Sequence, residues 1–259
     1  MEQYRNQNFY PEGINTELGD LLHEGEVHVW RANLGAPGGT EDWLWQLLSQ
    51  EERTRAQRFR FEQDRKRFVV ARGRLRQVLG DYLSCGGSEL QFGYSEHGKP
   101  YLSGVPLPLR FNLSHSGEIV LLAVSLGHEI GVDVEQVRQD VEVAKLAERF
   151  FSPYERARVL SLEGDEKVAA FFRVWAGKEA YVKARGAGLT LALDSFDVSV
   201  EAGEAAALVA TRPDRGDAER WKLWSLEAGP GYAAAMAVEG RTKPPQVFDW
   251  EAEGRLSRT

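Results

Sequence analysis

The sequence predicts an α+β protein made of two similar halves, each with helices first and strands after them. The prediction starts from an internal repeat, because three segments recur in the same order later in the chain. In the first pair, SQEERTR is matched by SPYERAR, and in the second, FVVARGR is matched by FRVWAGK. The matched segments are residues 48–56 with 151–159, 68–74 with 172–178, and 116–124 with 230–238.

The first half is predicted to hold a helix followed by short strands. Apolar residues between 68 and 79 recur at the spacing of one helical face, which indicates an amphipathic helix that extends to about residue 83. The pair Gly86-Gly87 ends this helix. Short apolar runs then predict strands at residues 90–94 and 109–113.

The second half is predicted to begin with two strands joined by a turn at Gly127-His128. Ser152 followed by Pro153 and Glu155 marks the start of a helix. The predicted elements are strands at 119–125 and 130–137, helices at about 141–150, 153–162 and 165–185, and strands near 195–200, 220–227 and 232–238.

These elements divide the chain into four parts. They are an N-terminal extension (1–26), an N-terminal α+β half (27–118), a C-terminal α+β half (119–240) and a tail (241–259). The tail shows little periodicity, so we expect it to be loosely attached.

The composition indicates a globular protein rather than a membrane or secreted one. Of the 259 residues, 42% are hydrophobic, and no apolar run approaches the ~18 residues that a membrane span needs. The first residues lack the basic start and apolar core of a signal peptide. Cys85 is the only cysteine, which excludes an internal disulfide and favours a reducing cytoplasm.

The charge is distributed unevenly along the chain. The net charge is −7, yet residues 53–76 carry nine arginines and Lys66 against only Glu62 and Asp64. A basic segment on an acidic protein favours a small anionic ligand over nucleic acid. The alternative interpretation is a solvated helix face.

Two carboxylates stand one residue apart in the predicted strand EIGVDVEQV. Because side chains alternate along a strand, Gly131, Asp133 and Glu135 leave one face while the apolar residues leave the other. The α-carbons of the two acids are then roughly 6.5–7 Å apart. A sheet face exposed to water would explain them, and so would a bound cation.

A third acid, Glu179, lies in the predicted helix FFRVWAGKEAYVKARGAGL. It shares an i, i+4 row with Phe171, Trp175 and Lys183, so it points toward the apolar stripe, where an unpaired carboxylate is costly. Lys183 or Lys178 could neutralise it. Asp133, Glu135 and Glu179 would also form an all-oxygen set of the kind that Mg²⁺ prefers.

The candidate anion-binding residues lie in two loops of the first half. The run from Gly93 to Lys99 satisfies G-x-x-x-x-G-K, but Pro100 stands where a nucleotide-binding P-loop has Ser or Thr, so we reject a P-loop. The HGKP turn still brings a lysine and the Gly98 amide to a loop tip. In RFNLSHSGE, Asn112 and Ser114 point away from the apolar face, and His115 stands at the end of the strand.

The motifs GKP, FNLSHSG, GVDVE and FFRVWAGKEAYVKARGAGL, in this order and spacing, resemble those of the 4′-phosphopantetheinyl transferases of the large, surfactin-synthetase-activating type. SQEERTRAQRFRFEQDRKRFVVARGRLR is also typical of that group, and the resemblance covers roughly residues 27–240. It implies a pseudo-twofold monomer of two α+β halves, each with a small, mainly antiparallel sheet packed by helices, and an active site between them.

The resemblance also implies roles for individual residues. Mg²⁺ on the diphosphate of coenzyme A would be held by Asp133, Glu179 and Glu135, although some relatives lack an acid at the position of Glu135. Lys183 matches a lysine that contacts the diphosphate, and Glu179 is the candidate base, ahead of Asp133. The segments that match coenzyme A contacts contain Arg55, Gly98, Lys99, Asn112, Leu113, Ser114 and His115, with Arg55 and His115 at the 3′-phosphate.

We therefore expect a cytoplasmic, Mg²⁺-dependent enzyme that transfers the 4′-phosphopantetheine group from coenzyme A to a serine of apo acyl or peptidyl carrier proteins. Two alternatives remain open: a Mg²⁺-dependent phosphohydrolase, and a non-enzymatic protein that binds coenzyme A or a carrier protein. No nucleic-acid or membrane partner is expected.

Overall fold

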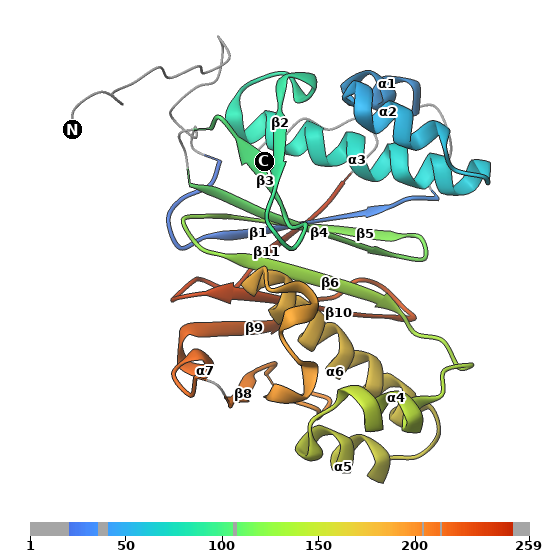
Figure 1. Ribbon diagram of the computed structural model, residues 1–259, viewed down its shortest axis with the longest axis vertical. Helices are drawn as coiled ribbons and strands as arrows, with labels where there is room; N and C mark the ends of the chain where they lie inside the picture. The colour runs from blue at the N-terminus through green and yellow to red at the C-terminus, as the bar shows by residue number, and fades with distance from the viewer. Residues whose placement is uncertain (1–20, 36–40, 106–107, 204, 213, 251–259) are drawn as a thin grey trace.

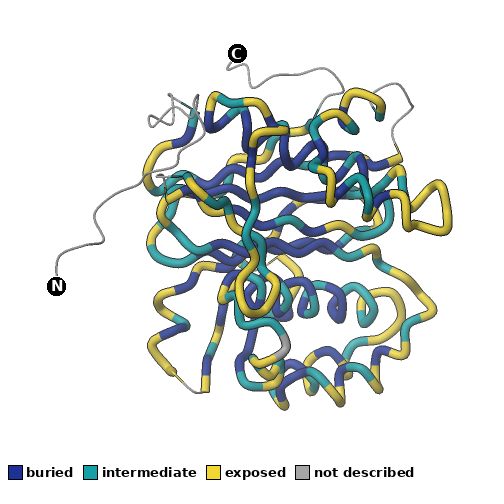
Figure 2. Tube along the Cα trace, turned by 45° about the horizontal axis from the view of Figure 1, so that its top comes forward, coloured by how far each residue is buried: buried dark blue, intermediate teal, exposed yellow. Residues whose placement is uncertain are grey.

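Two small sheets lie face to face at the centre of the molecule, and one long helix covers the outer face of each (Figure 1). The computed structural model describes residues 21–35, 41–105, 108–203, 205–212 and 214–250. Figure 2 shows that the central strands are mostly buried while the connecting loops are exposed. None of the helices in these ranges is long and apolar enough to span a bilayer.

The first sheet and its helices come from the N-terminal half of the chain. The elements are β1 (Val27–Asn33), α1 (Glu41–Leu47), α2 (Gln50–Gln57), α3 (Glu62–Leu83), β2 (Gln91–Tyr94), β3 (Pro100–Ser103), β4 (Leu109–Ser116) and β5 (Ile119–Leu126). Helix α3 packs its apolar face, including Leu75, Leu79 and Tyr82, on one side of this sheet.

The C-terminal half of the chain supplies the second sheet and its helices. The elements are β6 (Ile130–Gln136), α4 (Val143–Phe150), α5 (Pro153–Ser161), α6 (Gly164–Arg185), β7 (Phe196–Val198), β8 (Leu208–Thr211), α7 (Asp217–Arg220), β9 (Trp221–Ser225), β10 (Tyr232–Glu239) and β11 (Gln246–Asp249). Strands β6, β9 and β10 form the second sheet, β7 and β8 form a small separate sheet, and β11 joins the first sheet. Helix α6 covers this sheet through small residues such as Ala176 and Ala180.

The strand order is the same in both halves. The first sheet runs β11-β1-β5-β4 and the second runs β6-β10-β9, so β1, β5 and β4 correspond to β6, β10 and β9. Within each of these two sets neighbouring strands are antiparallel. The predicted fold class, two similar α+β halves with mainly antiparallel sheets, is confirmed.

A buried ion pair recurs in the two halves and explains the first pair of matched segments. Ser49 and Ser152 each cap a helix, and the glutamate three residues later, Glu52 or Glu155, bonds back to the serine amide. Glu52 accepts from Arg76 Nε at 2.6 Å, and Glu155 accepts from Lys178 Nζ at 2.7 Å. Arg76 and Lys178 are each the fifteenth residue of a 22-residue helix.

Strand β5 lies in the first sheet, between β1 and β4. The division expected at residues 118/119 therefore separates β5 from its pairing partners. We propose to divide the chain between β5 and β6, in the turn at Gly127-His128. The boundaries of the halves stay a prediction.

The expectation of a loosely attached tail is wrong for its described part. Strand β11 pairs in parallel with β1, and Phe248 stacks on Trp30 with ring centroids 4.7 Å apart. Asp249 also accepts from Arg31 Nε at 2.7 Å. Aromatic packing and main-chain pairing thus hold this segment, although its sequence has no clear period. Residues 251–259, and 1–20 of the expected N-terminal extension, lie outside the described residues.

Candidate active site

A polar seam joins the two halves where β4 runs beside β6. Three side chains of β4 accept hydrogen bonds from alternate backbone N–H groups of β6. These N–H groups point away from β10, the strand that pairs with β6 on its other side. Asn112 accepts from Val132, Ser114 from Val134 and Ser116 from Gln136, at 2.9, 3.4 and 3.0 Å. The alternation predicted for FNLSHS therefore points these polar side chains across the seam.

Gly131 brings β6 into direct contact with α6. A Cβ atom at this position would lie 2.2 Å from both Ala180 O and Ala184 N, so only glycine permits this approach. Asp133 and Glu135 leave the same face of β6 as Gly131. The close approach thereby brings both acids to the helix that carries Glu179 and Lys183.

Asp133 is the most buried acid of the site, with 3% of its surface exposed. Its Oδ1 accepts from Ser114 Oγ at 2.9 Å and from Lys183 Nζ at 2.5 Å. Burial raises the pKa of Asp133, although Lys183 acts against that rise. Its Oδ2 is buried and, among the described residues, has no hydrogen-bond partner.

Glu135 and Glu179 are electrostatically coupled to Asp133. Burial and the negative charge of Asp133 raise the pKa of both glutamates. Ser116 Oγ donates to Glu135 at 3.1 Å, which fixes that carboxylate at the end of the seam. Lys183 and Lys178, which could have neutralised Glu179, bond instead to Asp133 and to Glu155.

The three carboxylates match the chemistry of a magnesium site but do not form a finished one. Among the described residues, no three acidic, histidine or cysteine side chains are close enough together to be a ready-made metal site. The donors are all oxygens, one buried oxygen of Asp133 lacks a partner, and burial raises all three pKa values, with repulsion from Asp133 adding to the rise of the two glutamates. A divalent cation would relieve each of these conditions, so the donor set fits Mg²⁺.

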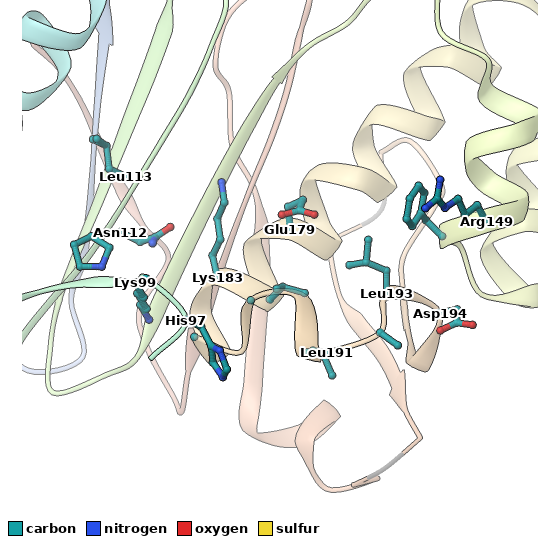
Figure 3. Close-up of a pocket in the computed structure, with 17 residues that line it drawn as sticks. His97, Lys99, Asn112, Leu113, Arg149, Glu179, Lys183, Leu191, Leu193 and Asp194 are labelled. Carbon is teal, nitrogen blue, oxygen red and sulfur yellow. The ribbon is translucent and has the colours of Figure 1, made fainter. Parts of the chain in front are cut away.

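A pocket of about 500 Å³ opens between the halves beside these acids. Figure 3 shows Glu179 and Lys183 on α6 at its centre, Lys99 and Asn112 on one side, and Arg149 and Leu193 on the other. The predicted residues that line it are Gly98, Lys99, Asn112, Leu113, Glu179 and Lys183. Ser114 and Asp133 lie just behind them in the seam.

Part of the pocket wall was not predicted. His97 adjoins the HGKP turn, Arg149 and Phe150 end α4, and residues 191–194 follow α6. The GAGL run after the last lysine of α6 was a signal for this loop, but nothing in the sequence indicated that α4 would reach the pocket.

His115 is exposed and lies in a cationic environment. Partial burial of its ring, together with the charges of Lys183 and Arg67, lowers the pKa of His115. Arg67 forms an ion pair with Glu118 and was not singled out by its sequence. These three basic side chains make this end of the seam suitable for an anion.

The basic segment of the first half serves more than one purpose. Arg72 and Arg76 both bond to the buried Glu52, so they stabilise the N-terminal half. Arg55 is exposed on α2, with its guanidinium over the Phe68 ring at 5.3 Å, and lines a separate surface pocket rather than the one between the halves. Its place at the 3′-phosphate stays a prediction.

The fold and the pocket define a class of protein: two duplicated α+β halves with a carboxylate- and lysine-lined pocket for an anionic ligand between them. Residues 129–237 match the family "4′-phosphopantetheinyl transferase superfamily", and residues 39–127 match "4′-phosphopantetheinyl transferase, N-terminal". The chain is 38% identical over 231 residues to the 4′-phosphopantetheinyl transferase HetI of Nostoc sp., covering 88% of this chain and 94% of that one. The chain belongs to the 4′-phosphopantetheinyl transferase family.

A second relative agrees with this finding, and one solved structure is similar over part of the chain. The chain is 32% identical over 202 residues to the 4′-phosphopantetheinyl transferase Sfp of Bacillus subtilis, covering 78% of this chain and 86% of the relative. The solved structure of Thermotoga maritima holo-[acyl-carrier-protein] synthase is 25% identical with a TM-score of 0.35, over 44% of this chain and 64% of that one. The predicted enzyme class, a phosphopantetheinyl transferase, is confirmed.

Proposed function

We propose that the pocket binds coenzyme A and that the enzyme transfers its 4′-phosphopantetheine group to a serine of an apo carrier protein. The observation that carries the proposal is that Lys183, Asp133 and Glu179 converge at one pocket between the halves. The relatives described above have transferase names, which favours transfer over hydrolysis or simple binding.

The reaction forms one bond and breaks one bond at phosphorus. The serine Oγ attacks the β-phosphorus, the bond from that phosphorus to the bridging oxygen breaks, and 3′,5′-ADP leaves with the electron pair. Such transfers depend mainly on positioning and on stabilising the developing charge. Lys183, which lines the pocket, would supply positive charge to the diphosphate.

Glu179 is the candidate acceptor of the serine proton. Glu179 lines the pocket, so its carboxylate would take this proton directly or through a water molecule. Asp133, Glu135 and Glu179 would hold Mg²⁺. When bound, the ion would neutralise charge on the diphosphate oxygens. Ser114 and Ser116 would keep Asp133 and Glu135 oriented toward it.

The remaining assignments are also proposals. Lys99 with the Gly98 loop, and residues 112–115, would contact coenzyme A, with His115 on the 3′-phosphate. The cationic surroundings of His115 support this placement. The monomeric state, the cytoplasmic location and the identity of the carrier protein stay predictions.

The direct test is to incubate the enzyme with an apo carrier protein, coenzyme A and Mg²⁺, and to weigh the carrier by mass spectrometry. We expect the carrier to gain the mass of one phosphopantetheine group, and to gain nothing when a chelator removes the metal. An unchanged carrier mass in the complete reaction would contradict the proposed function.

Variants test the residue assignments in the same assay. Asp133→Ala and Glu179→Ala should each reduce the transfer rate by more than about 100-fold, the upper end of a typical loss from a supporting residue around a metal. Asp165→Ala, an exposed acid in the first turn of the same helix as Glu179, is the matched control and should keep the full rate. Substantial transfer by either site variant would overturn the assignment.

A further inference from the structure

Glu129, in the turn before β6, holds a lysine of the opposite half. Its Oε2 accepts from Lys99 Nζ at 2.9 Å, and its Oε1 accepts from Arg110 Nε at 2.8 Å. Lys99 Nζ donates a second bond, also 2.9 Å, to Ala184 O in the last turn of α6. One N–H of the ammonium group therefore remains for a ligand in the pocket that Lys99 lines.

The hairpin loop that carries Lys99 packs tightly on the segment after α6. A Cβ at Gly188 would lie 3.2 Å from His97 Cβ, and a Cβ at Gly186 would lie 3.4 Å from Lys99 Cδ. Both glycines have positive φ, of 62° and 52° for Gly186 and Gly188, so they turn the chain where the loop needs space. The two segments form one end wall of the pocket.

We propose that Glu129 is a positioning residue for coenzyme A. It holds the loop that carries Lys99 against the end of α6, and so keeps this wall of the pocket in place. With Arg110 behind it, Glu129 holds the ammonium of Lys99 on the end of α6, so that residues 97–99 keep their place and the remaining N–H of Lys99 stays available to the donor. The inference rests on the proposed function, because it takes coenzyme A as the occupant of the pocket.

Positioning and charge predict opposite effects when Glu129 is changed. The carboxylate is negative and lies beside a site for a polyanion, so by Coulomb's law alone its removal would strengthen binding of coenzyme A. If Glu129 clamps the wall, its removal releases Lys99 and the loop, and binding weakens. The sign of the change therefore separates the two roles.

The test measures the affinity of the purified full-length enzyme for coenzyme A by calorimetry, without carrier protein. Glu129→Gln should weaken binding by about three- to ten-fold, the range for a coupled, partly exposed pair. Transfer assays should show the change in KM for coenzyme A, with kcat nearly constant. Adding Glu129→Gln to Lys99→Met should cause little further loss, because the clamp is already open.

Glu239→Gln is the matched control. Glu239 ends the neighbouring strand β10, its side chain is 41% exposed like that of Glu129, and it lies outside the lining of the pocket that the described residues form. The substitution Glu239→Gln removes the same charge as Glu129→Gln. It should change the affinity for coenzyme A less than two-fold, because an exposed ion pair contributes only about 0–1 kcal/mol.

Hydrogen exchange gives a readout that is independent of activity. The amides of Gly98 and Lys99 bond to Ser95 at 2.9 and 3.0 Å, and both should exchange faster in Glu129→Gln. Unchanged or tighter binding of coenzyme A by this variant, or unchanged exchange at these amides, would overturn the inference while leaving the proposed function intact. Failure of the unmodified enzyme to bind coenzyme A would overturn both.

Discussion

At the scale of single residues, the site concentrates negative charge where water is largely excluded. Burial raises the pKa of Asp133, Glu135 and Glu179, and the charge of Asp133 raises the pKa of the two glutamates further. One lysine compensates only part of this charge, through Asp133. Such repulsion destabilises the folded protein unless protons or a cation bind. The stability of the protein should therefore report on the site.

The first prediction concerns pH and magnesium. A carboxyl group with a raised pKa binds its proton more tightly in the folded than in the unfolded state. Its contribution to stability is thus present at low pH and is lost as the pH rises from the ordinary values of 3.8 and 4.5 through the raised ones. Asp133→Asn removes one such group. The stability of this variant relative to the unmodified protein should therefore improve as the pH rises above 3.8, the ordinary pKa of an aspartate, on top of a pH-independent difference caused by the loss of the Lys183 ion pair.

Magnesium should have the opposite dependence on pH, because protons compete with it for the same oxygens. Saturating Mg²⁺ at about 100 times its Kd would stabilise the protein by about 2.7 kcal/mol at pH 8, and by less at pH 5. Thermal unfolding at both pH values, with and without Mg²⁺, measures this, and Asp133→Asn should abolish the response. An equal Mg²⁺ response in that variant would show that the ion binds elsewhere.

The carboxylates of the site could be predicted from the sequence, but their bonding could not. Period-two alternation places Asp133 and Glu135 on one strand face, and the i, i+4 row places Glu179 with Lys183. That Lys183 bonds Asp133 rather than Glu179 depends on the distance between β6 and α6, which no local pattern encodes. Lys178, next to Glu179 in sequence, turns the other way to Glu155 for the same reason.

At the scale of elements, the site depends on two close contacts of β6. One is the polar seam with β4, where side chains take the place of main-chain pairing. The other is the contact with α6 at Gly131, where the backbones of strand and helix meet. Packed interiors transmit strain, so a methyl group added at Gly131 would displace α6 and move Glu179 and Lys183 relative to Asp133.

The second prediction follows from this contact. Gly131→Ala should destabilise the protein by about 1–3 kcal/mol, as expected for overpacking, and reduce the transfer rate of the folded fraction. Gly177→Ala is the control on α6 itself, because a Cβ there would meet Leu223 Cδ2 at an ordinary 3.4 Å. It should be tolerated or slightly stabilising, since alanine favours a helix. Chemical denaturation compares the two, and equal stabilities would contradict the role of Gly131.

The sequence predicted the long helices and most strands of the two main sheets, but not β1, β3 or β11. Strands 119–125, 130–137 and 232–238 are apolar and buried, so hydrophobic pattern and structure agree. Strand β3 has half-exposed residues and no clear alternation, and β11 is short and follows two prolines. Strand β11 owes its conformation to β1, a partner distant in sequence that local patterns do not report.

At the scale of the whole molecule, the duplicated halves use the same strand edge for different purposes. The outer edge of β6 faces the side chains of β4 and carries the site. The corresponding edge of β1 is covered by β11 instead. The duplication therefore yields one edge that carries the site, on β6, and one edge, on β1, that β11 covers.

The last prediction tests this closure by ending the chain after Gly240. Removal of β11 takes Phe248 from its stack on Trp30 and Asp249 from Arg31, and exposes the edge of β1. Loss of two packed aromatic side chains, Phe248 and Trp250, should lower the free energy of unfolding by more than about 1.5–3 kcal/mol, the value for one fully buried side chain. The open edge should promote self-association at high concentration. The rate of transfer by the monomeric fraction should stay close to normal, because β11 lies outside the pocket lined by the described residues. Val247→Ala, a change at a 46% exposed side chain of the same strand, should alter neither stability nor size in chromatography. A truncated chain as stable and as monodisperse as the full one would show that the edge of β1 needs no cover.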